Sequence, residues 1–114
     1  MNLAEFYKAI QGDYTEIKRN LIADDIIEDL VLDFLGDKSF QSLKKAFNTG
    51  DVNTAFLAAH TLKGVSASLG FKCLTTPVST ATEKLRNKNM LSPEEFAQIE
   101  EQYNKVIAAI NLYK

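Results

Sequence analysis

Residue types on which metal and disulfide chemistry depends are scarce in this chain of 114 residues, which has one cysteine, one histidine and no tryptophan. Cys73 has no second cysteine to pair with, so the sequence offers neither an intrachain disulfide nor a cysteine-based metal site. No His/Glu pair stands at i, i+3 or i+4 to build a metal or haem site in a helical core. The chain is therefore expected to hold no metal or cofactor of its own, and its lone thiol suits a reducing cytoplasm.

The sequence also has no excess of charge of one sign and no long apolar run. The 13 Lys and Arg against 15 Asp and Glu give a net charge of −2, so no basic surplus exists to neutralise a nucleic-acid backbone. No apolar stretch approaches the roughly 18 residues needed to span a membrane, and the N-terminus is already acidic at Glu5. A cytoplasmic protein with neither nucleic-acid nor membrane partners is predicted.

Motifs of stand-alone enzymes are missing as well. The sequence has no glycine-rich phosphate loop and no serine or cysteine nucleophile with a histidine-base motif, so a hydrolase or transferase is not predicted. The hydrophobic content is 46%, which allows residues 1–114 to form one domain. A domain of this size buries roughly 65% of the surface that its unfolded chain exposes.

Glycine and proline are sparse, with five and two copies, and the intervals between them carry the 3.6-residue period of helices. The predicted fold class is therefore all-α. The apolar pattern indicates two short N-terminal pieces and five longer segments, over 3–10, 14–21, 23–35, 39–47, 51–69, 76–85 and 93–110. In the 23–35 segment a broad apolar stripe is expected to face the core: Ile26, Ile27, Leu30, Val31, Phe34 and Leu35.

Local signals mark both ends of the 51–69 helix. Asp51 is placed to cap its N-terminus. Gly70 is expected to adopt the left-handed conformation of a helix C-cap, with Phe71 folding back onto Val65.

The other boundaries follow from similar signals. Ser39 is expected to cap the helix that follows Gly36. Pro77 cannot donate to a helical ladder, so regular helix is predicted there only from about Thr76. Ser92-Pro93-Glu94-Glu95 is a capping box with proline at the first helical position. Short connections make consecutive helices antiparallel neighbours, and we expect an antiparallel up-down four-helix bundle, bent at Gly36, with short N-terminal capping helices.

His60 is predicted to point away from the core. On the helical wheel it lies opposite the face shared by Ala55, Ala58, Leu62, Val65 and Leu69, so its ring is expected to be largely exposed. A lone histidine is more often an ordinary surface or hydrogen-bonded core residue. An exposed neutral imidazole nevertheless keeps a free lone pair on one nitrogen, and can act as a nucleophile.

The helical neighbours of His60 are Lys63 and Gly64, with Ala67 two turns along the same stripe. A glycine inside a helix costs about 1 kcal/mol relative to alanine. Gly64 either packs closely against another helix or clears room for a second protein beside the ring. Lys63 is either an ordinary solvated lysine or a positive charge for a phosphoryl group on His60.

The string His60-Thr61-Leu62-Lys63-Gly64, with a second glycine six residues later at Gly70, resembles the signature of histidine-containing phosphotransfer (HPt) domains, H-x-L-K-G. Phe56-Leu57-Ala58-Ala59 before the histidine and Phe71 after the second glycine are also similar to that family, and the predicted bundle covers essentially the whole chain. The arrangement from Met1 onward is similar to small freestanding HPt proteins of bacteria.

The resemblance implies an intermediate of a multistep phosphorelay. His60 would take a phosphoryl group from an aspartate of a response-regulator receiver domain and pass it to another, with a hybrid sensor histidine kinase among the partners. Lys63 would stabilise the phosphate, and Gly64 would give steric access. Mg²⁺ and an acidic pocket in the receiver would handle the developing charge, so the chain would be a phosphocarrier and not an enzyme.

Around His60, the receiver-docking residues are expected to be Leu57, Thr61, Lys63, Gly64 and Ala67, because an exposed apolar patch beside a reactive group suits transient binding. Phe56 is better explained by packing between helices. Many family members place Gln or Glu on the next helix to hydrogen-bond the other ring nitrogen. The corresponding position is near Thr82, which leaves its hydroxyl, a water or Glu83 to orient the imidazole.

A second hypothesis is a helical adaptor that docks kinase or receiver domains without being phosphorylated. It would use the surface of Leu57, Lys63, Gly64 and Ala67 for binding alone. A monomer is the default expectation under either hypothesis, because that face must remain reachable.

Overall fold

The computed structural model describes residues 1–20 and 23–114, and in these residues the chain consists of helices joined by short turns, with no strand. The prediction of an all-α fold is confirmed. The elements in chain order are α1 (Leu3–Ala9), α2 (Tyr14–Asn20), α3 (Asp24–Asp33), η1 (Phe34–Gly36, a 3₁₀ turn), α4 (Ser39–Thr49), α5 (Val52–Ser68), α6 (Lys72–Arg86) and α7 (Pro93–Tyr113). None of the described helices combines the length and apolarity that a membrane crossing requires.

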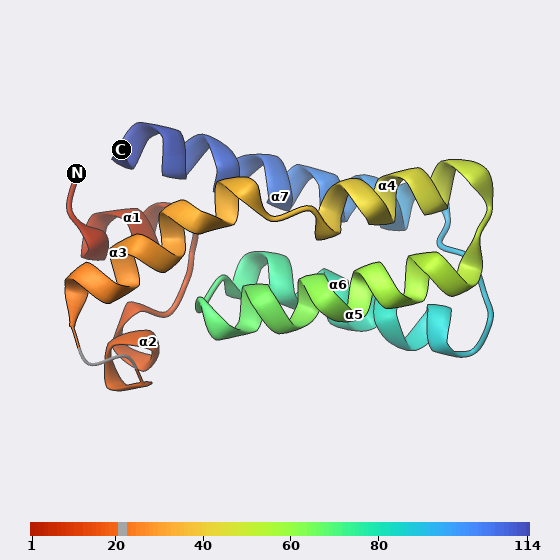
Figure 1. Cartoon of the computed structure of the whole chain (residues 1–114), viewed down its shortest axis with the longest axis horizontal. Helices are drawn as coiled ribbons and strands as arrows, with labels where there is room; N and C mark the ends of the chain where they lie inside the picture. The colour runs from red at the N-terminus through yellow and green to blue at the C-terminus, as the bar shows by residue number, and fades with distance from the viewer. Residues whose placement is uncertain (21–22) are drawn as a thin grey trace.

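Helices α4, α5, α6 and α7 form the body of the molecule and alternate in direction along its longest dimension of 40 Å (Figure 1). α5 packs against both α4 and α6, and α6 packs against α7. α3 continues α4 through the η1 turn, so the first long helical segment is divided in two near Gly36. α1 packs on α7 at the end where both chain termini lie (Figure 1).

Aromatic pairs lie at both ends of a core that is otherwise mostly aliphatic. Phe40 stacks on Tyr103 with ring centres 4.0 Å apart, and Phe47 stacks on Phe96 at 4.5 Å, which joins α4 to α7. At the other end the Phe34 and Phe71 rings meet edge to face at 5.4 Å. Such aromatic pairs contribute about 0.5–1.5 kcal/mol beyond the area that they bury.

The N-terminal residues hold the C-terminal end of α5. The Tyr7 hydroxyl donates to the Leu69 carbonyl at 2.6 Å, and the Asp13 backbone N–H donates to the Gly70 carbonyl at 3.2 Å. Gly12 passes so close that a Cβ there would lie 2.7 Å from the Gly70 carbonyl oxygen. Burial raises the pKa of Tyr7 well above its ordinary value, so the hydroxyl keeps its proton for this bond.

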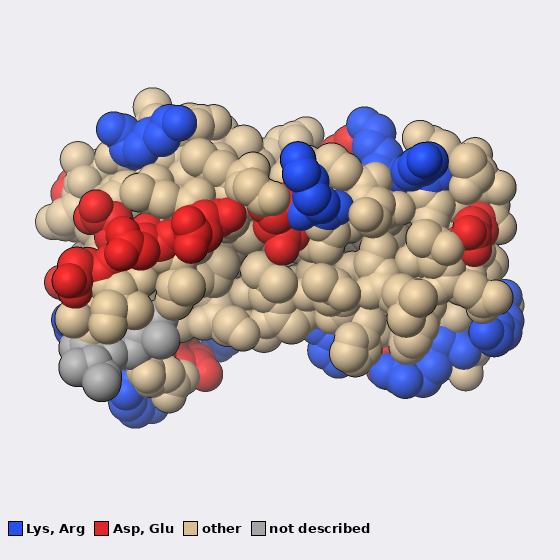
Figure 2. Space-filling model, in the orientation of Figure 1, with Lys and Arg blue, Asp and Glu red and all other residues tan. Residues whose placement is uncertain are grey.

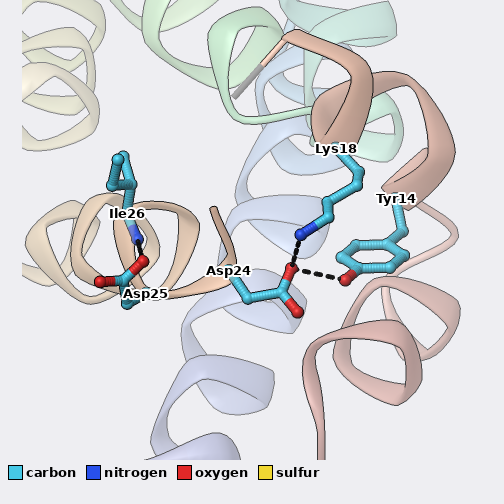
Figure 3. Close-up of polar contacts among 5 residues, drawn as sticks. All are labelled: Tyr14, Lys18, Asp24, Asp25 and Ile26. Atoms are coloured by element: carbon cyan, nitrogen blue, oxygen red, sulfur yellow. Dashed lines mark hydrogen bonds and ion pairs between the residues drawn. The ribbon is translucent and has the colours of Figure 1, made fainter. Parts of the chain in front are cut away.

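Polar contacts attach α2 to the start of α3 (Figure 3). The Tyr14 hydroxyl and the Lys18 ammonium both donate to Oδ1 of Asp24, at 2.7 and 2.8 Å. These hydrogen bonds, with the one from Lys18 the stronger influence, hold the pKa of Asp24 below its usual range. Leu21, which the sequence pattern placed at the end of the second piece, lies outside the described residues.

Two predicted helix starts are wrong. Ser39 is the first residue of α4 and not its cap; instead the Asp37 carboxylate accepts from both the backbone N–H and the hydroxyl of Ser39. α6 begins at Lys72 and contains Pro77 in its interior. Its first turn forms early because the buried Phe71 carbonyl accepts from the N–H groups of Leu74 and Thr75.

The apolar stripe predicted for residues 23–35 is narrower in the structure. Ile27, Val31 and Phe34 are buried, whereas Ile26 is 44% exposed and Leu30 is 39% exposed. α3 lies at one side of the molecule, so only one face of it has a neighbour to pack against (Figure 1).

Candidate functional site

Helix α5 carries His60, and both of its ends are fixed by hydrogen bonds. At the N-terminus the Asp51 carboxylate accepts from the backbone N–H and the hydroxyl of Thr54, at 3.1 and 2.6 Å. The hydroxyl bond, followed by the backbone bond, lowers the pKa of Asp51, which keeps this cap ionised.

At the C-terminus of α5 the chain makes a complete Schellman turn. Gly70 has φ +72°, its N–H donates to the Ala67 carbonyl, and the Phe71 N–H donates to the Ser66 carbonyl at 2.9 Å. Phe71 is fully buried there among the rings of Phe6, Tyr7 and Phe34. The helix that presents His60 is therefore rigidly bounded.

The structure brings the predicted site residues onto one open strip of α5. His60, Gly64 and Ala67 are exposed, Lys63 is half-buried, and Leu57 is 65% exposed beside them. The opposite side of α5 is buried through small and apolar side chains: Ala55, Ala58, Ala59, Leu62 and Ser66. Because α5 is held by α4 on one flank and α6 on the other, the strip faces solvent between them.

Gly64 has open space where its side chain would be. A Cβ placed there would meet no atom within 4 Å outside its own helix turns. The interpretation that Gly64 permits close packing of a neighbouring helix is therefore wrong. The missing side chain instead leaves the surface one turn beyond His60 flat.

On the α6 flank the imidazole has an aromatic neighbour and, beyond it, a cation. The half-buried Phe56 ring lies 5.9 Å from the His60 ring, centre to centre, and the Arg86 guanidinium carbon lies 5.0 Å from the centre of the same Phe56 ring. Arg86 also pairs with Glu83 at 3.4 Å. Sequence reasoning missed Arg86, although it stands one helical turn after Thr82 and so shares its face of α6.

Thr82 does not orient the imidazole in this structure. Its side chain is fully buried, and its hydroxyl donates at 2.7 Å to the Val78 carbonyl within α6. A hydroxyl has one proton to donate, and Thr82 uses it here. No hydrogen bond joins the His60 ring to another residue in the described part of the chain, and Glu83 is engaged with Arg86.

The family comparison agrees with the motif around His60. A family model described as "Hpt domain" matches residues 3–109. The chain belongs to the HPt domain family. Domains of this family are phosphocarriers and not enzymes, act in histidine phosphotransfer within phosphorelays, and interact with receiver and kinase proteins. Searches of curated proteins and of solved structures found no match.

On the α4 flank of this HPt domain, a shallow hollow of about 420 Å³ adjoins the strip. Leu57 and Thr61 form its edge on α5, and Asp37 and Lys38 lie on the far side. The Thr61 hydroxyl donates to the Leu57 carbonyl at 3.0 Å, so it turns back along the helix. A protein that covers His60 would therefore meet the exposed Leu57 side chain and, beyond it, a hollow whose exposed lining is mostly apolar.

The arrangement around His60 leaves the ring open to a partner and does not enclose it in a catalytic pocket. The ring is exposed and stands on a rigid helix, with the Lys63 ammonium group one turn away as a mobile positive charge. The open geometry suits accepting a group that a partner delivers, because the partner can bring its own reacting atoms against the ring.

Proposed function

We propose that this HPt domain carries a phosphoryl group on His60 between aspartates of receiver domains in a multistep phosphorelay. The observation that carries the proposal is the exposed imidazole next to the open space at Gly64. The H-x-L-K-G motif and the family match over residues 3–109 support it. In this proposal α4, α5, α6 and α7 are the four-helix bundle that presents His60, and α1 and α2 cap one end.

The reaction needs no metal ion or cofactor held by this chain. A ring nitrogen of neutral His60 attacks the phosphorus of an aspartyl phosphate, and a P–N bond forms as the P–O bond to the aspartate breaks. The aspartate carboxylate leaves with the electron pair, while the other ring nitrogen keeps its proton. Passage to a second receiver reverses these steps, and the receiver's acidic pocket and Mg²⁺ stabilise the transferring group.

Each neighbour of His60 has a role in this scheme. Lys63 provides positive charge for the phosphoryl oxygens, and Gly64 leaves room for the receiver. Leu57, Thr61 and Ala67 supply the docking surface around the ring, of which Leu57 offers the largest exposed apolar side chain.

A label chase tests the relay role. One receiver is charged with radiolabelled phosphoryl groups and mixed with the HPt domain, and a second, unlabelled receiver is added afterwards. The proposal predicts that the label moves onto the HPt domain and then to the second receiver. His60→Gln should block both steps while its helical content and receiver binding persist. A His60→Gln protein that still supports signalling in cells would establish the non-phosphorylated adaptor.

A further inference from the structure

Acidic side chains are concentrated in one short part of the chain. Residues 23–37 contain six of the 15 acidic residues and none of the 13 Lys and Arg. The nine acids elsewhere are outnumbered by those 13 basic residues. Figure 2 shows the result as a continuous acidic band along α3 that reaches the middle of the molecule.

Two carboxylates of this band are without internal partners. The other four have partners within the chain: Asp24 pairs with Lys18, Asp25 accepts from the Ile26 N–H, Glu28 accepts from the Tyr113 hydroxyl, and Asp37 accepts from Ser39. Asp29 and Asp33 are exposed and make no hydrogen bond or ion pair with any residue that the structure describes. Their charges remain available to a partner.

The band borders an apolar groove. A groove of about 310 Å³ lies between α3 and α5, with a floor and walls that are mostly apolar: Leu30, Phe34, Val65 and Leu69. Asp33, Asp37 and Ser68 complete its lining. Leu30 is 39% exposed although it lies at this groove, and Ile26 one turn earlier is 44% exposed.

The groove is close enough to His60 for one bound protein to cover both. Ser68 lies on the same stripe of α5 as His60 and Gly64, and its hydroxyl donates to the Gly64 carbonyl at 2.8 Å. Eight residues of helix separate it from His60, which is about 12 Å. A standard protein interface buries roughly 800 Å² on each partner, so one that covers His60 reaches this groove.

We propose that the acidic groove, defined as this groove together with Asp29, which stands one helical turn before Asp33 on α3, selects receiver domains whose docking face carries an apolar side chain flanked by Lys or Arg. This inference rests on the proposed function and names the chemistry of its partner. The apolar side chain fills the groove, and the basic groups meet Asp29 and Asp33. A second copy of this chain fits poorly, because a symmetric contact would set one acidic band against another.

Charge and apolar burial act on different parts of the binding reaction. Exposed complementary charges speed diffusional encounter and are screened by salt, with a Debye length of about 10 Å at 0.1 M ionic strength. Burial of the apolar side chain is insensitive to salt at these concentrations and mainly slows dissociation. The two contributions can therefore be measured separately.

The experiment compares two double variants that each remove two negative charges. Asp29→Asn with Asp33→Asn changes the acidic groove, and Glu94→Gln with Glu101→Gln changes exposed acids of α7. Second-order rates of phosphoryl transfer are measured at 20 and 300 mM NaCl. The donors are two phosphorylated receivers, one with a basic docking face and one with an acidic docking face. Dissociation constants of the same two receivers in their unphosphorylated form are measured in parallel.

The proposal predicts that the groove variant slows transfer from the basic receiver about five- to tenfold at 20 mM salt and that this difference largely disappears at 300 mM. The α7 variant should match the wild type. Leu30→Gln should weaken binding by a similar factor at both salt concentrations. Equal rates for the two double variants at 20 mM, or a preference of the wild type for the acidic receiver, would overturn the inference.

Failure of the proposed phosphocarrier function would give a different result from failure of the docking proposal. If no receiver phosphorylates the wild type, the phosphocarrier role is lost, and the dissociation constants then decide the docking proposal by the same comparison. If the wild type forms dimers that Asp29→Asn with Asp33→Asn strengthens, the acidic groove is a self-association surface and the proposal is wrong.

Discussion

Arg86 of α6 stacks its guanidinium over the Phe56 ring of α5, 5.0 Å from the ring centre. The Phe56 ring in turn lies 5.9 Å from the His60 ring, centre to centre, so one aromatic ring separates a planar cation from the imidazole. A cation at an exposed aromatic ring is stabilised by about 0.5–1 kcal/mol. Arg86 therefore has a defined position against Phe56 that the long side chain alone would not give it.

We predict that Arg86→Gln shortens the lifetime of phosphohistidine at position 60 by up to about fivefold, because an exposed pair of opposite charges, here the Arg86 cation and the phosphoryl oxygens, contributes up to about 1 kcal/mol. The measurement is loss of labelled phosphate from the purified phosphoprotein over time. Arg86→Lys is the matched control, since it keeps the charge but loses the planar stacking, and it should fall between Arg86→Gln and the wild type. A lifetime in Arg86→Gln equal to the wild-type value would return Arg86 to a role in packing alone.

The open space at Gly64 predicts opposite effects on stability and transfer. Because a side chain meets nothing there, Gly64→Ala and Gly64→Gln should both raise the free energy of unfolding, by up to about 1 kcal/mol in urea titrations. Only the longer glutamine should obstruct the receiver and slow transfer at least about tenfold. A Gly64→Gln protein that is less stable than wild type yet transfers normally would show that the glycine serves the fold.

The sequence was sufficient to predict the features of α5 that depend on near neighbours. Asp51, Gly70 and the H-x-L-K-G motif all act within one or two turns, where helix capping and periodicity apply. The same local rules correctly placed the capping box at Ser92, whose hydroxyl accepts from the Glu95 N–H.

The errors occurred where packing between distant segments decides the outcome. Phe71 is buried among rings from α1 and η1, and this starts α6 five residues before Pro77. Thr82 is fully buried by the packing of the helices, so its hydroxyl bonds the Val78 carbonyl, and motif spacing does not reveal that burial. The position of Arg86 depends on the distance between α5 and α6, and therefore emerged only with the structure.

Gly12 is predicted to be required for attachment of the N-terminal residues to α5. A Cβ there would lie 2.7 Å from the Gly70 carbonyl oxygen and 2.8 Å from the Tyr7 ring, too close for either to tolerate. Gly12→Ala should lower the free energy of unfolding by about 1–3 kcal/mol. Gly36→Ala is the matched control, because no atom lies within 4 Å of its Cβ, and it should be neutral or stabilising. Equal stability of the two variants in urea titrations would contradict the close approach.

The capping box of α7 predicts how the stability of the fold changes at low pH. The hydrogen bond from Lys84, followed by that from the Ser92 backbone, lowers the pKa of Glu95 to about 2 from its ordinary 4.5. A depressed carboxyl pKa stabilises the fold above the unfolded-state value and loses that effect as pH falls through the folded-state value. Glu95→Gln should therefore lower Tm at pH 7, and the difference from wild type should shrink between about pH 4.5 and 2. Glu101→Gln, which removes an exposed acid of the same helix, is the matched control and should leave Tm at pH 7 close to the wild-type value.

The most direct test of the account is to locate the phosphoryl group. The HPt domain is incubated with a receiver charged by a small phosphodonor, and the product is mapped by mass spectrometry under alkaline conditions that preserve phosphohistidine. The account predicts one added phosphoryl group, on His60, and none on a His60→Gln protein whose circular dichroism matches the wild type. A phosphoryl group on another residue, or no adduct from several receivers that demonstrably bind, would contradict it.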